Sequence, residues 1–198
     1  MKKGLLIALG ILVAMIAFFA MTWSRIYNQL VTSEEGVKSA WAQVENVYQR
    51  RLDLIPNLVE TVKGYAVHER ETLQGVVEAR SNISHINVTS DVINNPSLFA
   101  QFQQMQGELS SALSRLMVVV ERYPDLKASQ NFLTLQTQLE GTENRIVVER
   151  KRYNETAQTF NTKRRVFPNI LIANRMGFSE KAYFKSEESA AKAPQVKF

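Results

Sequence analysis

Apolar residues along this chain follow two patterns, one unbroken run near the N-terminus and several stripes of helical spacing after it. The run, from Gly4 to Trp23, contains 20 residues and no charged side chain. A helix rises about 1.5 Å per residue, so this run reaches about 30 Å, the thickness of the hydrocarbon core of a bilayer. Trp23 ends the run, where an indole ring suits the headgroup region. The pattern predicts one N-terminal transmembrane helix.

A cleaved signal peptide is the alternative interpretation of the same run. Signal peptides have an apolar core of about 7–15 residues and small residues at the cleavage site. This run is longer, it ends in Ala-Phe-Phe-Ala-Met-Thr-Trp, and the chain has no cysteine for lipid attachment. A retained anchor is therefore favoured. Lys2 and Lys3 predict a cytoplasmic N-terminus, whereas Arg25 reduces this charge asymmetry.

After the anchor, apolar positions recur at steps of three and four residues, which is typical of amphipathic helices. The first stripe keeps its phase across Pro56, which predicts a continuous, kinked helix, with a hairpin near Gly64 as the alternative. The residues of this stripe are Trp41, Val44, Tyr48, Leu52, Ile55, Val59, Val62 and Ala66.

Two further helices are predicted after a loop at Ser84–Pro96. Ser97 is the expected N-cap of the first, which ends before Pro124, and Lys163-Arg164-Arg165 suits the C-terminus of the second. The inward positions of the first are Leu98, Phe102, Met105, Leu109, Leu113, Leu116 and Val120. Those of the second are Phe132, Leu135, Leu139, Thr142, Ile146, Tyr153, Ala157 and Phe160.

The stripes together predict an all-α fold, an antiparallel helical bundle of three to four long helices preceded by one transmembrane helix. The expected divisions are an anchor at residues 1–25, a bundle at 26–185 and a disordered tail at 186–198. The tail is rich in Ala, Ser, Glu and Lys, and it cannot bury enough apolar area to order itself.

Charge argues against a nucleic-acid partner. The formal net charge is +5, but three of these charges belong to Lys2, Lys3 and Arg25 around the anchor. The remaining chain carries 21 basic and 19 acidic side chains, which is close to balance. A nucleic-acid-binding protein usually carries a strongly basic face.

Motifs for catalysis or metal binding do not occur in the sequence. His68-Glu69 begins like a zinc-peptidase motif, but Thr72 stands where the second histidine is required. There is no phosphate-binding loop, no nucleophile elbow and no cysteine. We therefore expect no enzymatic activity and no cofactor. A metal-dependent enzyme that uses the glutamate-rich helices remains a minor alternative.

Polar residues around the proline of the first stripe form the candidate partner-docking site. Two roles for Pro56 are open: its bend lets the helix wrap its neighbours, or it opens a polar notch for a partner. We favour docking, although a local salt bridge with solvated charges explains the same residues. The residues of this site are Arg50, Arg51, Asp53, Pro56 and Asn57.

A basic cluster at Lys163–Arg165 precedes the apolar segment Phe167–Met176. This combination is typical of an interfacial segment that binds acidic lipid. The alternative is a last helix that folds back on the core.

Several short stretches, in order from the anchor to about Phe184, carry a resemblance to a known family. They are Tyr27-Asn28, Leu30-Val31, Arg50-Arg51, Asp53-Leu54-Ile55-Pro56-Asn57-Leu58-Val59-Glu60-Thr61-Val62-Lys63-Gly64-Tyr65, His68-Glu69, Tyr123-Pro124-Asp125-Leu126-Lys127, Asn131-Phe132, Glu140-Gly141-Thr142-Glu143-Asn144-Arg145-Ile146, Arg150, Tyr153-Asn154 and Phe167-Pro168. Together they resemble the LemA family, with Leu52 where that pattern more often has Ala. The resemblance implies a single-pass protein of the bacterial cytoplasmic membrane with a helical-bundle body and no established biochemical activity.

Anchor, amphipathic helices and missing catalytic groups favour a membrane-tethered scaffold or adaptor for other membrane proteins. The alternative is a membrane-shaping or lipid-binding structural protein. A protein partner is expected, and the sequence leaves its identity and any self-association open.

Overall fold

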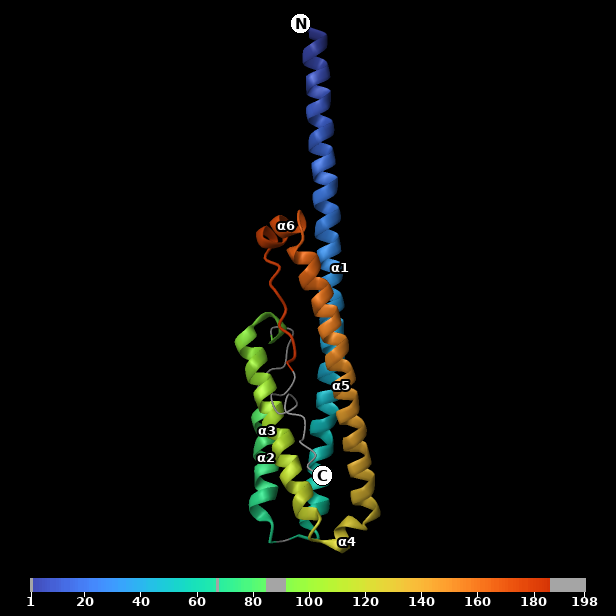
Figure 1. The fold of residues 1–198 in the computed structure, drawn as a ribbon, viewed down its shortest axis with the longest axis vertical. Helices are drawn as coiled ribbons and strands as arrows, with labels where there is room; N and C mark the ends of the chain where they lie inside the picture. The colour runs from blue at the N-terminus through green and yellow to red at the C-terminus, as the bar shows by residue number, and fades with distance from the viewer. Residues whose placement is uncertain (1, 67, 85–91, 186–198) are drawn as a thin grey trace, which may run out of the picture.

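Helices account for nearly all the regular structure of the protein. The computed structural model describes residues 2–66, 68–84 and 92–185, and no strand occurs among them. In chain order the elements are α1 (Lys2–Lys63), α2 (Arg70–Ser84), the 3-10 helix η1 (Val92–Asn94), α3 (Pro96–Val120), α4 (Pro124–Lys127), α5 (Gln130–Arg165) and α6 (Asn169–Met176). Figure 1 shows α1, α2, α3 and α5 running in alternating directions side by side. The predicted all-α antiparallel bundle is confirmed.

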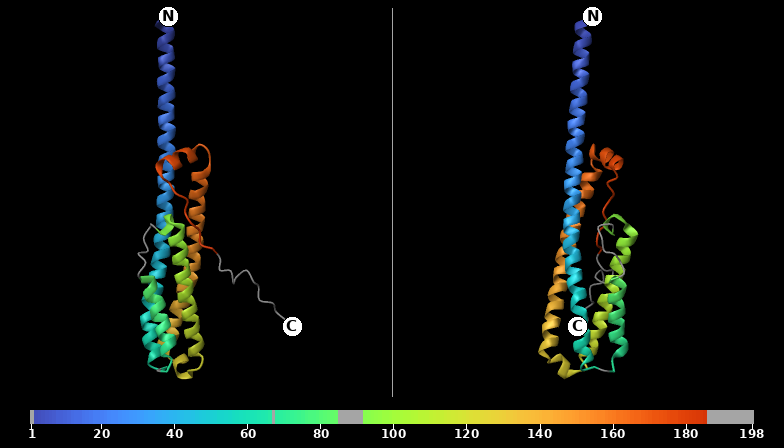
Figure 2. Two further views of the ribbon diagram at one scale, coloured as in Figure 1. Left: turned by 90° about the vertical axis from the view of Figure 1, so that its left-hand side faces the viewer. Right: turned by 180° about the vertical axis from the view of Figure 1, so that it is seen from behind.

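Anchor and bundle share one helix. α1 is unbroken over 62 residues, and its N-terminal part extends alone beyond the rest of the molecule (Figure 2). Within the described residues, α1 is the one helix long and apolar enough to cross a membrane. The apolar side chains from Leu5 to Met21 are exposed, because no other described helix covers them. The protein is therefore located in a membrane through this segment.

Two hydrophobic clusters form the core below the anchor. The one nearer the anchor surrounds Trp41, whose ring lies 5.5 Å from those of Phe102 and Tyr153 and 5.8 Å from that of Phe99. The farther cluster joins α1, α2 and α3 and also includes Leu126 of α4 and Phe132 of α5. Trp41 and Phe132 are both buried, as the sequence predicts.

The turn after α1 follows the hairpin alternative. α1 continues through Pro56, ends at Lys63, and is joined to α2 by residues 64–69, so both the continuous helix and the hairpin near Gly64 occur. At this end of the bundle Glu69 accepts a hydrogen bond from the Tyr123 hydroxyl (3.0 Å) and pairs with Arg122 (3.0 Å). These contacts connect the hairpin to the turn between α3 and α4.

The start of α3 differs from the prediction. Asn95, not Ser97, caps the helix, because its side chain accepts hydrogen bonds from the backbone N–H groups of Ser97 and Leu98, with Pro96 at the first helical position. Leu98 is exposed and Phe99 is buried in its place. Of the segment predicted as a loop, Val92–Asn94 forms η1, and residues 85–91 lie outside the described residues.

An extended segment, residues 178–185, follows α6 and returns along the bundle; we term it the strap. Asn161 holds its Lys181 through two 2.9 Å hydrogen bonds, to the backbone carbonyl and from the backbone N–H. Asn154 binds the backbone of Phe184 in the same way, also at 2.9 Å. The two asparagine side chains thus take the place of a neighbouring strand. The predicted disordered tail, residues 186–198, lies outside the described residues.

Candidate functional site

A groove runs between α3 and α5 in the half of the bundle that lies away from the anchor. Its volume is about 510 Å³. Its lining residues are Arg51, Ser110, Leu113, Ser114, Met117, Gln136, Leu139, Glu140, Glu143 and Asn144. Only Arg51 comes from α1, which forms the floor, while α3 and α5 supply the two walls.

Arg51 connects the floor of the groove to both walls. Its side chain is 2% exposed; its Nη2 donates to the Ser110 hydroxyl of α3 (2.7 Å), and its Nε pairs with Glu143 of α5 (2.9 Å). A buried guanidinium is stable when its charge is paired and its N–H groups have acceptors. Arg51 therefore links α3 to α5 through one contact with each helix, at the polar part of the groove.

The walls combine hydrogen-bonding groups with a strip of apolar surface. Ser114, Gln136 and Asn144 offer hydroxyl and amide groups, and Glu140 adds an exposed carboxylate. Met117 and the buried Leu113 and Leu139 supply apolar contacts. Among the described residues, no group of three or more His, Asp and Glu is placed to hold a metal ion. The arrangement suits binding of a protein segment.

The structure separates Arg51 from the other four predicted docking residues. Arg50, Asp53, Pro56 and Asn57 are exposed on the opposite side of α1, and Asp53 accepts a hydrogen bond from Gln49 (2.8 Å). Arg50 lines a shallow pocket of about 220 Å³ shared with α5, which includes Arg145 and Glu149. The five residues therefore belong to two faces of one helix.

A side chain from α2 replaces the backbone hydrogen bond that α1 loses at Pro56. Proline has no N–H, so the carbonyl of Leu52, four residues earlier, lacks its usual helical donor. Arg80 of α2 donates to this carbonyl from its Nε at 3.0 Å. This contact is a structural compensation for the proline.

A second ionic cluster joins the strap to α1 and η1, through residues that are far apart in the sequence. Lys181 of the strap is 1% exposed, and its ammonium donates to Glu34 of α1 and to Asn94 of η1. The Phe160 ring lies 5.2 Å from the same nitrogen, which is close enough for a cation–π contact. The sequence signal is weak: Lys181 stands between two aromatic positions, Phe178 and Phe184.

Ionisable groups in the core are arranged for packing. Burial raises the pKa of the Tyr48 hydroxyl, although Arg150, which donates to that hydroxyl at 2.6 Å, opposes the shift. Burial also raises the pKa of Tyr153, whose hydroxyl donates to the Ala182 carbonyl of the strap at 3.0 Å. Both tyrosines therefore remain protonated hydrogen-bonding groups at neutral pH.

Known proteins resemble this chain along most of its length. Protein LemA of Metamycoplasma hominis is 27% identical over 180 residues, which cover 87% of this chain and 78% of that protein. Magnetosome protein MamQ 2 of Paramagnetospirillum magneticum is 27% identical over 203 residues (92% and 72%), and magnetosome protein MamQ of Magnetospirillum gryphiswaldense is 26% identical over 208 residues (97% and 75%). The family model described as LemA family matches residues 40–198. The chain belongs to the LemA family.

Proposed function

We propose that this protein is a membrane-anchored adaptor without enzymatic activity, which binds a segment of a partner protein in the groove between α3 and α5. The observation that supports this proposal is the groove itself, with a volume of about 510 Å³ and a floor fixed by the buried Arg51. A groove that is open to solvent and has mixed polar and apolar walls suits an amphipathic segment of a partner protein.

Charge indicates the chemistry of the partner segment. Arg51 is paired with Glu143, whereas Glu140, the other carboxylate on the wall of α5, accepts a hydrogen bond from the neutral Gln136 at 3.0 Å and has no ion-pair partner among the described residues. Gln136, Ser114 and Asn144 add neutral hydrogen-bonding groups. We expect a segment with one apolar stripe, to cover Met117, and a flanking Lys or Arg, to pair with the glutamate.

The position of the groove sets where the partner is bound. From Trp23 to Arg51 the unbroken α1 rises about 42 Å, at about 1.5 Å for each of 28 residues. We propose that the N-terminus is cytoplasmic, as Lys2 and Lys3 indicate, and that the groove is presented on the extracytoplasmic side of the bacterial cytoplasmic membrane. A reporter fused after Phe198 tests this orientation, and activity of a reporter that works only in the cytoplasm would reverse it.

Site-specific photo-crosslinking in intact cells tests the groove. A photoreactive residue replaces Gln136 in the groove, and the same residue replaces Asn57 on the outer face of α1 as the comparison. We expect a discrete adduct from position 136. An adduct of twice the mass of this chain identifies the partner as a second copy, whereas another mass identifies a different protein.

Two serines of α3 provide a matched pair that shows whether the adduct depends on the groove. Ser114 lines the groove and Ser111 does not; both are exposed, and both bond to the carbonyl four residues earlier, at 2.9 and 3.0 Å. Ser114→Trp should abolish the adduct at position 136, and Ser111→Trp should leave it. An adduct only from position 57 moves the docking site to the face of Arg50, Asp53, Pro56 and Asn57. Adducts from neither position contradict the adaptor proposal.

A further inference from the structure

Helix α6 divides its apolar side chains between the core and the solvent. Ile172 and Ala173 are buried, and the following Phe178 contacts the ring of Tyr27 in α1 at 5.9 Å. On the other side, Leu171 is 61% exposed, and Phe167, two residues before the helix begins, is 80% exposed. We term residues 166–176 the α6 tip. One face of the tip packs on the core, which agrees with the alternative of a last helix that folds back. The other face is exposed.

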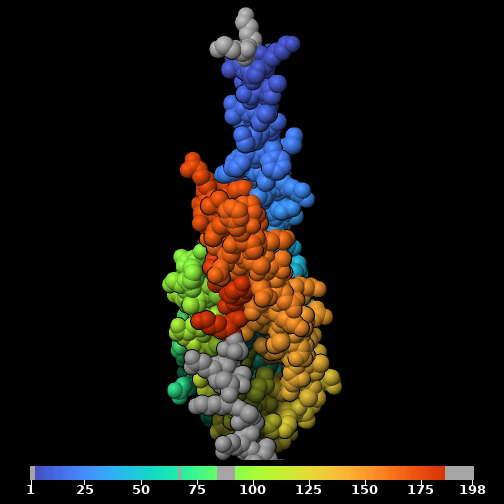
Figure 3. All heavy atoms as spheres, turned by 45° about the horizontal axis from the view of Figure 1, so that its top comes forward, coloured from blue at the N-terminus to red at the C-terminus, as the bar shows by residue number. Residues whose placement is uncertain are grey.

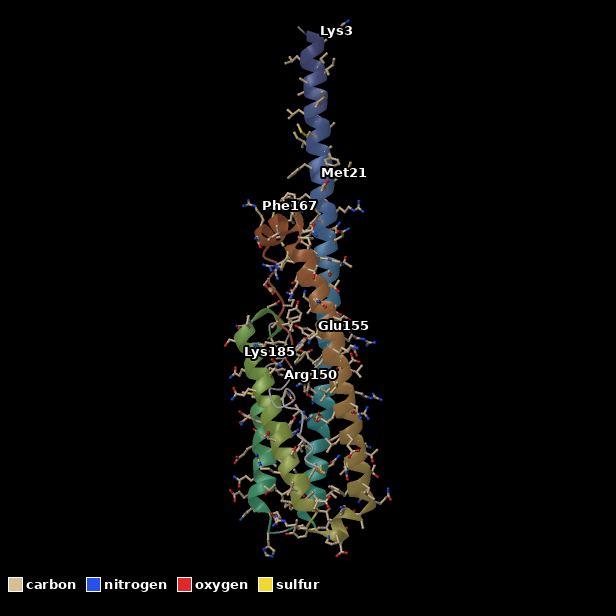
Figure 4. The ribbon with its side chains drawn as sticks, in the orientation of Figure 1. Lys3, Met21, Arg150, Glu155, Phe167 and Lys185 are labelled. Atoms are coloured by element: carbon tan, nitrogen blue, oxygen red, sulfur yellow. The ribbon has the colours of Figure 1, made fainter. Side chains whose placement is uncertain are left out.

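The uncovered face of the tip lies at the level where the anchor ends. Met21 is exposed, whereas Trp23 and Tyr27 are partly buried against the core cluster, so the lipid-facing part of α1 stops at about this position. Figure 4 shows Phe167 near the height of Met21, and Figure 3 shows α6 beside α1 where the lone helix meets the body. A helix that exposes apolar side chains at the level where an anchor leaves the hydrocarbon is typical of an interfacial segment.

Positive charge surrounds the same tip. Arg25, Lys163, Arg165 and Arg175 are exposed, and none of them has an ion-pair partner among the residues that the structure describes. The sequence has no Asp or Glu between residues 1 and 33 or between 156 and 179. Cations without acidic neighbours, placed at a bilayer surface, attract anionic headgroups.

We propose that the α6 tip and the adjoining end of α5 bind acidic phospholipid. Phe167, Leu171 and Met176 of the tip lie in the interface, and Arg175, together with Lys163 and Arg165 of α5, binds the phosphate groups. The tip then gives the body a second attachment to the bilayer beside the anchor. This attachment limits how far the bundle can tilt about the point where α1 leaves the membrane.

Fluorescence of single-cysteine variants of the full-length chain tests the proposal. The chain has no cysteine, so Leu171→Cys carries one environment-sensitive label. Val118→Cys, at an exposed apolar site on α3 away from the anchor, carries the matched control. Both variants are reconstituted into phosphatidylcholine vesicles with or without phosphatidylglycerol, and a fraction of the lipid bears a quencher at headgroup depth. We expect a blue shift and quenching at position 171 in the phosphatidylglycerol vesicles and neither at position 118.

Charge reversal tests the contribution of the cations. The triple change Lys163→Glu, Arg165→Glu and Arg175→Glu should abolish quenching at position 171. The control triple, Arg115→Glu, Arg145→Glu and Lys151→Glu, makes the same change in net charge at exposed sites farther from the tip and should preserve it. Equal emission at positions 171 and 118 would overturn the proposal. Equal quenching with and without phosphatidylglycerol would overturn its acidic-lipid part.

Discussion

Arg80 of α2 donates a hydrogen bond from its Nε to the backbone carbonyl of Leu52 in α1, at 3.0 Å. That carbonyl is the one that Pro56 deprives of its helical donor. The guanidinium therefore replaces a missing backbone N–H across two helices, and the two chain segments, 28 residues apart, form one structural unit.

A double-mutant cycle tests this unit by measuring the free energy of unfolding. Arg80→Met should lower it by about 1–3 kcal/mol, since a partly buried carbonyl loses its donor. Pro56→Ala should raise it by as much as about 3 kcal/mol, because alanine restores the helical N–H. In the Pro56→Ala background the cost of Arg80→Met should be smaller. Strict additivity of the two changes would show that the side chain does not serve the proline.

Truncation of the central ring should destabilise the bundle strongly. Trp41 is 1% exposed and contacts four aromatic rings, so Trp41→Ala should cost about 3–5 kcal/mol of unfolding free energy. Phe132→Ala, in the other cluster, should cost a similar amount. Val118→Ala, at an exposed site, is the control and should change little. Chemical denaturation monitored by circular dichroism gives all three values.

The ion pair of the strap, with its lysine buried and its glutamate partly exposed, should show a charge-dependent penalty. Lys181→Met leaves Glu34 without its cation and should lower the free energy of unfolding by about 1–3 kcal/mol, less than for a fully buried pair because water still reaches the glutamate. Adding Glu34→Gln should recover most of this loss, because no unpaired charge is then left.

Lys38→Met is the matched control for the strap, since Lys38 makes an exposed pair with Glu35 at 2.7 Å. Its effect should stay within about 1 kcal/mol. An equal loss in the single and double variants of the strap would assign the effect to packing of the lysine stem instead of its charge.

Glu45 should make stability depend on pH with a definite sign. Burial raises the pKa of this carboxyl above its usual 4.5, although the hydrogen bond from the Trp41 indole (2.7 Å) opposes the shift. The folded state then binds the proton more tightly than the unfolded state. The contribution of this group is fully present below pH 4.5 and is lost as pH rises through the raised folded value.

Glu45→Gln removes this titration and keeps an oxygen to accept from the indole. The variant should be more stable than the parent at neutral pH, and the difference should vanish below pH 4.5. A difference that is constant across pH would mean that the carboxyl does not titrate differently in the two states.

The long helices could be predicted from the sequence because their burial follows a local rule. Apolar residues at steps of three and four determine the inward face, so α5 was predicted with its buried residues from Phe132 to Phe160 and its end at Arg165. The prediction was wrong at the start of α3. The N-cap is Asn95, two residues before the predicted Ser97, and Phe99 is buried instead of Leu98. A cap can be fixed by several adjacent polar residues, and periodicity does not choose among them.

Buried charges could not be predicted, because their partners are distant in the sequence. The sequence around Arg51 is equally compatible with a solvated cation, because its partners Ser110 and Glu143 come 59 and 92 residues later. The same is true of Lys181, whose partner Glu34 precedes it by 147 residues. The five candidate residues lie along one stretch of α1, but their division into two faces depends on tertiary contacts that the sequence does not reveal.

Because α1 is continuous, the rotation of the anchor about its helix axis determines the rotation of the bundle about the same axis. With 3.6 residues per turn, one residue inserted between Trp23 and Ile26 would rotate every lipid-facing side chain by about 100° relative to the groove, whereas seven would return it to within about 20°. A neighbouring transmembrane helix that packs against one side of the anchor therefore also determines the direction, in the plane of the membrane, toward which the groove faces.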